Sequence, residues 1–349
     1  MRAVDSKIEV IIPNWNGSKM LQHCLQSLYE QTFTDFSVTV VDNGSTDDTE
    51  KVLLRDYPLV QLIKFSYNTG FSVAVNAGVE RSEADLVLLL NNDMEIDPHC
   101  LEHLYAGACK YESYDFFALK MLSFNKRNIL DGAGDAVLRG GVGYRLGTLE
   151  CDGKKYSYDR EVFGACGGAA LYRKSFFLKT GLFDPDFFAY LEDVDLNLRA
   201  RRNGMRCMYL CRAVVYHIGS ATSGSKINPL TIRLSTRNNL NVLIKNYPLS
   251  YLFRFGPAIL VYQFMWLVFC CKKMMFFAWM QGIYEAFKNI TIFLPKRRAL
   301  LGSESKIDDG DLATQIVNAE KNAVESIISR RSFEGKGSSL LQMYCKLFF

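Results

Sequence analysis

Short apolar runs alternate with helical patterns over the first hundred residues. The β-branched or leucine-rich runs lie at 9–12, 38–41, 60–65 and 86–90. Between the first two runs, one helical face carries Met20, Cys24, Leu25 and Leu28, and a second helical pattern follows a Gly-Phe turn at 73–79. Strands that alternate with helices at this spacing predict βαβ units. We therefore expect an α/β fold with a mostly parallel central sheet and helices on both faces.

Polar clusters follow three of these apolar runs. The candidate positions are Pro13, Asn14 and Asn16 after the first run, Asp42, Asn43, Gly44, Ser45 and Asp47 after the second, and Asn91, Asn92 and Asp93 after the fourth. Ligands of such sheets bind beyond the carboxyl ends of the strands. The sequence therefore predicts a site at this edge of the sheet.

The residue types in these clusters suit a nucleotide and a metal ion. Asp42 at a strand end can accept hydrogen bonds from a base or ribose, and Asp93 can reach a divalent cation that bridges a diphosphate. The alternative for both clusters is a turn that caps the next helix. A dinucleotide-binding fold is not favoured, because no G-x-G-x-x-G follows the first run.

The second part of the chain contains a further group of carboxylates. Residues 112–165 are rich in Gly, Tyr and turn signals and do not predict defined strands. A Gly-rich segment at 164–173 leads to a helical pattern that opens with Glu192, Asp193 and Asp195 and stops at Gly204. A carboxylate aimed at a pocket can deprotonate a sugar hydroxyl. The alternative is a set of partners for the helix dipole. Arg199, Arg201 and Arg202 could neutralise some of this acidic charge, but such residues more often form a solvated face.

Two β-like runs follow and end at His217. This histidine closes the apolar run 214–216 and precedes small hydroxyl residues. A lone histidine is more often structural, but its place at the end of an apolar run favours a metal ligand.

The composition changes after about residue 225. Residues 255–271 are apolar and are flanked by Arg254, Lys272 and Lys273. As a helix this segment is about 25 Å long, shorter than the roughly 30 Å hydrocarbon core of a bilayer. In the next segment, one helical face carries Phe276, Met280, Ile283, Phe287 and Ile290, and the other carries Gln281, Glu285 and Lys288. These features indicate attachment to a membrane surface; the alternatives are a buried helical hairpin and a homo-oligomer interface.

Composition and charge narrow the class of protein. Apolar residues make up 49% and charged residues 22% of the 349 residues, enough for a large core. The net charge of +4 does not favour nucleic-acid binding, which normally requires a clustered basic face. Ten cysteines without C-x-x-C pairs predict free thiols in a reducing compartment. The first apolar run is too short for a signal peptide, so we expect a cytoplasmic catalytic region.

Taken in order, these segments resemble family 2 glycosyltransferases with the GT-A fold, especially bacterial rhamnosyltransferases and galactofuranosyltransferases that build cell-surface polysaccharides. The resemblance covers about 8–220 and continues more weakly to near 300. It rests on VIIPNWNG (10–17), VVDNGSTDDT (40–49), NTGFSVAVNAG (68–78), LLLNND (88–93), GACGGAALYRKS (164–175), GLFDPDFFAYLEDVDLNLRARRNG (181–204) and VVYHIGSATSG (214–224).

The resemblance implies a role for each matching position. Pro13, Asn16, Asp42 and Ser45 would line the nucleotide pocket, Asn68, Gly70 and Phe71 would lie beside the sugar and diphosphate, and Gly167 and Gly168 would let the sugars approach the backbone. Asn91-Asn92-Asp93 stands at the DxD motif, so that Asp93 and His217 would hold Mg²⁺ or Mn²⁺. Asn91 replaces the first Asp of that motif and leaves fewer negative ligands. Asp193 would be the general base, and Glu192 would shape the acceptor pocket.

The implied reaction is an inverting transfer from a nucleotide-diphosphate sugar, such as dTDP-rhamnose or a UDP-sugar, to a saccharide or lipid-linked saccharide at the inner face of the cell membrane. The implied organisation is a catalytic domain at 1–225 (a nucleotide-binding half at 1–97 and an acceptor-binding half at 98–225), a membrane-associated helical region at 226–300 and a polar tail at 301–349. For 303–336, which is polar and low in aromatics, a loose helix is the alternative to a tail. A nucleotidyltransferase is disfavoured because 13–20 lacks a basic Gly-rich loop. A degenerate membrane scaffold is the non-enzymatic alternative.

Overall fold

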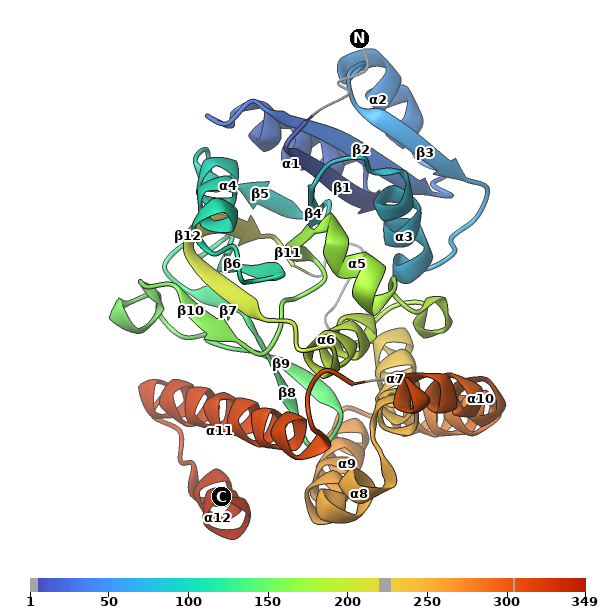
Figure 1. The fold of residues 1–349 in the computed structure, drawn as a ribbon, viewed down its shortest axis with the longest axis vertical. Helices are drawn as coiled ribbons and strands as arrows, with labels where there is room; N and C mark the ends of the chain where they lie inside the picture. The colour runs from blue at the N-terminus through green and yellow to red at the C-terminus, as the bar shows by residue number, and fades with distance from the viewer. Residues whose placement is uncertain (1–5, 220–226, 304) are drawn as a thin grey trace.

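The computed structural model describes residues 6–219, 227–303 and 305–349 (Figure 1). The domain boundary expected at 225 and the end of the 214–224 segment lie outside these ranges. One ten-stranded sheet crosses the molecule, with a path of eight strands in the order β10-β12-β6-β11-β4-β1-β2-β3. The path consists of β10 (Arg160–Val162), β12 (Cys207–His217), β6 (Phe116–Ser123), β11 (Ala169–Arg173), β4 (Leu86–Leu90), β1 (Ile8–Asn14), β2 (Phe36–Asn43) and β3 (Gln61–Phe65).

The sheet is parallel in its first half and mixed in its second half. Strands β3, β2, β1 and β4 are parallel, as the alternating pattern predicted. Strand β11 runs antiparallel between β4 and β6, and β5 (Met94–Ile96), β7 (Leu130–Ala133) and β10 are also antiparallel to their neighbours. The prediction of a mostly parallel sheet is therefore correct only for the first half. The reason is that a parallel neighbour needs a long crossover, usually a helix, and 112–165 forms short strands joined by turns instead.

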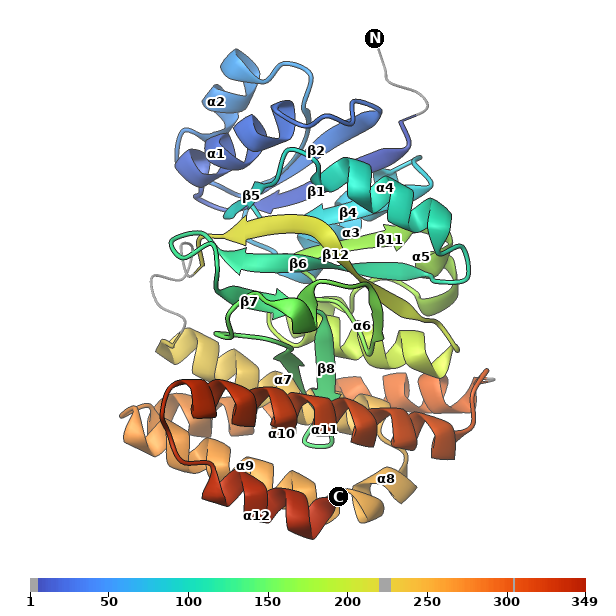
Figure 2. The ribbon, with the colours of Figure 1, turned by 90° about the vertical axis from the view of Figure 1, so that its left-hand side faces the viewer.

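Helices cover both faces of the sheet (Figure 2). One face carries α1 (Ser18–Tyr29), α2 (Thr49–Asp56) and α4 (Cys100–Lys110), and the other carries α3 (Phe71–Arg81), α5 (Lys174–Thr180) and α6 (Glu192–Arg202). Strand β4 shows the result, because Leu88 lies in the core on one face and Leu89 in the core on the other. A strand buried on both sides is a continuous apolar run, which explains the sequence LVLLL.

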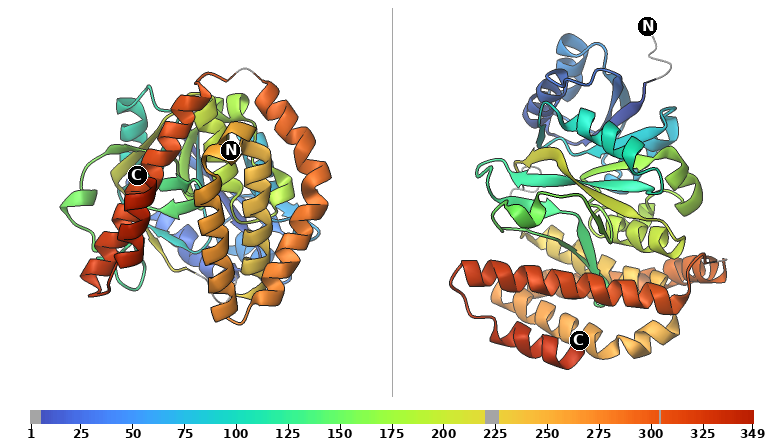
Figure 3. Two further views of the ribbon diagram at one scale, coloured as in Figure 1. Left: turned by 90° about the horizontal axis from the view of Figure 1, so that it is seen from below. Right: turned by 60° about the vertical axis from the view of Figure 1, so that its left-hand side comes forward.

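The C-terminal helices form a layer against the second half of the sheet (Figures 2 and 3). They are α7 (Pro229–Asn246), α8 (Leu249–Arg254), α9 (Gly256–Lys272), α10 (Phe276–Gly302), α11 (Asp309–Phe333) and α12 (Ser339–Phe348). Helices α7 and α10 approach closely at Gly282, where a β-carbon would lie 2.5 Å from the carbonyl oxygen of Arg233. Within the described ranges, none of the helices has both the length and the apolar character to cross a bilayer.

The segment 301–349 is not a polar tail, as the sequence predicted, but forms α11 and α12. Helix α11 buries Leu312, Ala313, Ile316 and Ala323 and lies against β8 (Asp135–Leu138), which pairs with β9 (Val142–Arg145). Its buried Glu320 forms an ion pair with Arg139. The buried positions are mostly small residues at helical spacing, so the segment has little of the hydrophobic signal that predicts a packed helix.

Candidate functional site

Polar side chains from three strand ends meet at one edge of the sheet. Asn14 and Asp42 lie opposite each other where β1 and β2 end. The amide of Asn14 donates to the hydroxyl of Thr49 (3.1 Å), and its carbonyl oxygen accepts from Asn92 (2.6 Å). The buried carboxylate of Asp42 accepts from the backbone N–H of Ser45 (3.1 Å). The structure therefore joins residues from all three predicted clusters.

The loops after β1 and β2 are bound to each other. Asn16 has a left-handed backbone (φ 50°), and its N–H donates to the hydroxyl of Ser45 (2.9 Å). Asp47 accepts from the N–H of Ser18 at the start of α1 (2.9 Å) and from Thr49 at the start of α2 (3.1 Å), the capping alternative considered for this cluster. Pro13 lies in β1 directly before this loop, opposite Val41.

The turn at 68–71 requires glycine. Asn43 donates to the carbonyl of Gly70 (3.0 Å), and the side chain of Asn68 accepts from the N–H of Gly70 (2.9 Å). Gly70 has φ +89°, and a β-carbon there would lie 2.6 Å from the ring of Phe188. Gly44 has φ +77° and equally little space. Gly44 thus allows a close approach of the Tyr67 backbone, and Gly70 allows a close approach of Phe188.

Asp93 and His217 face each other at the ends of β4 and β12. The Nε2 atom of His217 lies 3.3 Å from Oδ2 of Asp93, and its Nδ1 atom lies 2.7 Å from Asp131. The Oδ1 atom of Asp93 is buried and makes no hydrogen bond to any residue that the structure describes. Asn91 is held beside Gly168, whose carbonyl accepts from its N–H (2.8 Å). The expected metal ligands are thus adjacent.

These side chains fit a divalent cation. A carboxylate with a free oxygen is a preferred ligand of Mg²⁺ and Mn²⁺, and an imidazole nitrogen is a common ligand of divalent transition metals. Asp131 occupies the second nitrogen of His217, the arrangement that orients metal-binding histidines, and is itself paired with Arg145. Burial alone lowers the pKa of His217, but hydrogen bonds to Asp131 and Asp93 outweigh it and raise the pKa above its ordinary value.

Helix α6 presents two carboxylates at its N-terminus. Asp193 is partly buried, and its oxygens accept from the backbone N–H groups of Gly167 (3.2 Å) and Val194 (2.8 Å). Glu192 is buried, and its Oε2 atom has no hydrogen-bond partner among the described residues. Burial and, second, the charge of Asp193 raise the pKa of Glu192 to about 8. A β-carbon on Gly167 would touch both Asp193 (3.4 Å) and Phe71 (3.5 Å), so the 68–71 turn lies next to this helix end.

The turn before α6 is strained, and the sequence did not indicate this. Phe188, Tyr190 and Leu191 have left-handed φ values of 65°, 70° and 64°. The buried amide of Asn238 on α7 donates to carbonyl groups within 187–190 at 2.7–2.9 Å and holds the turn in place. Such backbone strain is concentrated at functional sites. The turn places Phe188 against Gly70 and determines the position of the N-terminus of α6.

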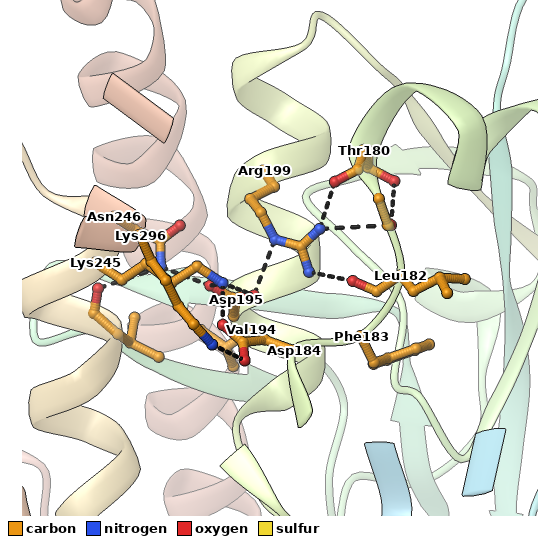
Figure 4. A network of polar contacts seen from close by, with 12 residues as sticks. Thr180, Leu182, Phe183, Asp184, Val194, Asp195, Arg199, Lys245, Asn246 and Lys296 are labelled. Atoms are coloured by element: carbon orange, nitrogen blue, oxygen red, sulfur yellow. Dashed lines mark hydrogen bonds and ion pairs between the residues drawn. The ribbon is translucent and has the colours of Figure 1, made fainter. Parts of the chain in front are cut away.

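Asp195, the third acidic residue of α6, does not belong to the site. It is fully buried and accepts from Arg199, Lys245 and Asn246, each at 2.9 Å (Figure 4). Although burial opposes it, the charges of Lys245 and Arg199 lower the pKa of Asp195 far below its usual range. Asp195 is therefore part of a structural ion network that joins α6 to α7.

The prediction that the arginines of α6 form a solvated face is wrong. Arg199, Arg201 and Arg202 are all buried. Arg199 donates to the carbonyls of Thr180 and Leu182, and Arg201 donates to Glu161 and to nearby carbonyls. A guanidinium group has five N–H donors. Here these donors form hydrogen bonds with carbonyl groups of the buried loops around α6.

Asp135 was not predicted, because it lies in 112–165. Single ligand atoms of Asp135, Cys166 and Asp193 lie within 4.8 Å of one another. Burial raises the pKa of Asp135 to about 8, with a further contribution from Asp193. Burial also raises the pKa of the Cys166 thiol, and all ten cysteines are free. Burial therefore favours the protonated forms of Asp135 and Cys166 at neutral pH.

Comparisons with known proteins identify related sequences. Residues 9–181 match the family model described as glycosyl transferase family 2. The chain is 26% identical over 239 residues to the N-acetylglucosaminyl-diphospho-decaprenol L-rhamnosyltransferase of Mycobacterium tuberculosis, covering 62% of this chain and 78% of that protein. It is 27% identical over 252 residues to the uncharacterized glycosyltransferase YwdF of Bacillus subtilis, covering 69% of this chain and 88% of that protein.

The fold also matches a solved structure. The structure of GalNAc-T7 with UDP, GalNAc and Mn²⁺ aligns with a TM-score of 0.56 and 17% identity, over 68% of this chain and 48% of that chain. At this identity the match shows a shared fold alone.

Proposed function

We propose that this chain, whose residues 9–181 match glycosyl transferase family 2, transfers a sugar from a nucleotide-diphosphate donor to a saccharide or lipid-linked saccharide by metal-assisted direct displacement. The chain is a glycosyltransferase with the GT-A fold. The main supporting observation is that the Asp93–His217 pair and the Asp193 carboxylate come from distant parts of the sequence and lie at one edge of the sheet. This is the arrangement that such a displacement needs.

In this proposal Asp93 and His217 hold Mg²⁺ or Mn²⁺. When bound there, such an ion would supply positive charge next to the departing diphosphate. The free oxygen of Asp93 and the orientation of His217 by Asp131 support this assignment. The Mn²⁺ in the GalNAc-T7 structure is a further support.

The remaining site residues bind the donor and move one proton. Asp193 accepts the proton of the acceptor hydroxyl as that oxygen bonds to the anomeric carbon. The sugar–phosphate bond breaks in the same step, so the anomeric configuration inverts. Asn14, Asn16, Asp42, Ser45 and Asp47 form the nucleotide side, and Asn68, Gly70 and Phe71 form the sugar side.

The donor is a dTDP- or UDP-linked sugar, and rhamnose is favoured by the similarity to the mycobacterial L-rhamnosyltransferase. A thermal-shift screen of nucleotide sugars with Mn²⁺ identifies it, because selective binding raises apparent stability. With the identified donor, EDTA should abolish release of the nucleotide diphosphate and excess Mn²⁺ should restore it. His217→Ala should lower the rate about 100-fold or more, whereas His99→Ala, which changes an exposed histidine, should not. Full activity in EDTA would refute the metal assignment, and no turnover of any nucleotide sugar would favour the scaffold.

The proposal places the enzyme at the inner face of the cell membrane through its C-terminal layer. Along α9, Leu260, Val261, Phe264 and Met265 are exposed at helical spacing. Other exposed apolar side chains in the layer are Phe253, Met274, Phe277, Met280, Phe287, Leu340, Met343 and Leu347. Residues 249–294 contain four cationic residues and one acid, Glu285. An apolar face with flanking cations fits an anionic lipid surface.

Helix α10 supports this orientation. Phe276, Met280 and Phe287 of its apolar face are exposed, whereas Glu285 on the polar face is partly buried beside Arg233. We expect the protein to float with vesicles of phosphatidylglycerol and phosphatidylcholine. Serine at Phe264 and Phe277 should release it, whereas Leu59→Ser, which changes a leucine that is 81% exposed in the nucleotide half, should not. Failure to bind the vesicles, with a concentration-dependent dimer instead, would support the homo-oligomer interface.

A further inference from the structure

The carboxyl group of Asp135 occupies a fixed position beside the proposed base. Asp135 begins β8, and its backbone exchanges two hydrogen bonds with Gly164 (2.9 and 3.0 Å). Only 6% of its surface is exposed, and its Oδ1 atom has no hydrogen-bond partner in the described part of the chain. A buried carboxyl oxygen without a hydrogen-bond partner is unfavourable. This indicates that Asp135 binds a ligand and does not serve only to pack the free protein.

The spacing between Asp135 and Asp193 suits a bridging hydroxyl group. Their nearest ligand atoms are no more than 4.8 Å apart, together with the sulfur of Cys166. A hydrogen bond between oxygens is about 2.5–3.0 Å long. One hydroxyl oxygen between the two carboxyls can therefore reach both of them.

A cavity next to Asp135 offers space for a substrate. Asp135 lines this cavity of about 430 Å³ between β8, β10 and α11, within the size range of small-molecule sites. Another lining atom, Oε1 of Gln315, also has no hydrogen-bond partner within the described residues. An unsatisfied amide oxygen is suited to a hydroxyl-bearing ligand such as a saccharide.

The charges around Asp135 favour its protonated form. The groups that face it or line the same cavity are Asp193 and Arg201 from α6, Arg145 from β9, Asp131 from β7, Glu161 and Arg160 from β10, Glu325 and Gln315 from α11, Lys155, Cys166, Tyr172 and Cys207. Arg145 is paired with Asp131, and Arg201 is paired with Glu161. Burial and the charge of Asp193 together raise the pKa of Asp135 to about 8.

Asp193 is the better site for the negative charge. It receives two backbone hydrogen bonds and lies in the first turn of α6, where the helix dipole favours an anion. Near pH 7 the pair therefore consists of one acid and one carboxylate, as expected when two such groups lie close together.

We propose that Asp135 is a second acceptor-binding residue, which donates its own proton in a hydrogen bond to the acceptor hydroxyl while Asp193 accepts the proton of that hydroxyl. This inference rests on the proposed function. In the transfer, the hydroxyl proton moves to Asp193, the oxygen bonds to the anomeric carbon and the sugar–phosphate bond breaks. Asp135 keeps its proton throughout. Above pH 8 it becomes an anion that cannot donate.

The test is the pH dependence of transfer in the wild-type enzyme, Asp135→Asn and the control Asp56→Asn on an exposed residue. The wild-type rate should fall about tenfold from pH 7 to pH 9 as Asp135 ionises. Asp135→Asn should lower the pH 7 rate about threefold and remove the fall at high pH, because an amide donates at every pH. Asp56→Asn should follow the wild-type curve.

The outcomes separate this inference from the proposed function. If wild-type turns over no nucleotide sugar, the proposed function fails. If it is active and Asp135→Asn keeps the wild-type fall at high pH, the inference is wrong. Should Asp135→Asn not fold, infrared difference spectra of Glu192→Gln provide the second measurement, because this variant removes the other buried carboxyl with a pKa of about 8. A protonated carboxyl band that is present at pH 7, lost near pH 8 and perturbed by added acceptor supports the inference, and its absence at pH 7 refutes it.

Discussion

Asp193 and Asp195 lie two residues apart on α6, yet their carboxyl groups have different partners and their pKa values are shifted in opposite directions. Asp195 is fully buried and is compensated by Arg199, Lys245 and Asn246. Asp193 receives backbone hydrogen bonds and has Glu192 and Asp135 nearby. The pKa of Asp195 is lowered in spite of complete burial, whereas burial raises that of Asp193. Burial alone therefore does not set the charge state; the supply of compensating donors does.

The ion network around Asp195 also joins α6 to the C-terminal helices. Lys245 on α7 pairs with both Asp195 and Asp184, and Lys296 on α10 pairs with Asp184 (Figure 4). The C-terminal layer thus holds the helix that presents Asp193 to the site. We expect changes at Asp195 to affect folding and changes at Asp193 to affect chemistry.

The largest expected effect is on catalysis. Asp193→Asn should lower transfer by about 10²–10⁴-fold, the usual contribution of a general base. The isosteric amide keeps the shape of the site, so the melting temperature and the affinity for the nucleotide should stay close to wild-type. Near-normal turnover of Asp193→Asn would remove Asp193 from the role of base.

The next effect is on stability. Asp195→Ala should lower the free energy of unfolding by about 3–5 kcal/mol, because it leaves buried cations without their partner. The folded-state pKa of Asp195 is lowered, so its contribution is complete above its unfolded pKa of about 3.9 and is lost as the pH falls below it. Denaturant titration measures the change. Adding Lys245→Met should recover part of the loss, and strictly additive losses would contradict a shared network.

The third expected effect is on the pH dependence of stability. The pKa of Glu192 is raised to about 8 in the folded protein, from about 4.3 when unfolded. Between these two pKa values, the folded state therefore binds more protons than the unfolded state. Wild-type should lose stability as the pH rises through this range. Glu192→Gln should raise the melting temperature at pH 8 but not at pH 4. The exposed control Glu30→Gln should change neither, and an equal shift for Glu192→Gln at both pH values would contradict the ionisation account.

The first half of the fold could be predicted because its signals are local. The run at 86–90 coincides with β4, and the runs at 9–12, 38–41 and 60–65 fall in or overlap β1, β2 and β3. The polar clusters after them meet as expected, since parallel strands end at the same edge of the sheet. Asp93 and His217 were also predicted, and the structure brings them to 3.3 Å.

The second half could not be predicted in the same way. Asp131, Asp135 and Arg145 lie in short strands with little periodic signal, and antiparallel pairing between distant segments brings them to the site. Asn238 acts from α7 on a turn about 50 residues earlier. Its role depends on three non-glycine residues with left-handed backbone, a conformation that such residues rarely adopt.

The sequence by itself determined the α/β class, the edge of the sheet where the site lies and the presence of carboxylates in it. Each of these follows from the periodicity of side chains along a single strand or helix. Only the tertiary structure decided which carboxylate of α6 is neutralised and which faces the site, because the cations of Lys245 and Lys296 and the carboxyl of Asp135 arrive from other elements. Electrostatic energy depends on distance in space and on burial, and neither can be read from spacing along the chain.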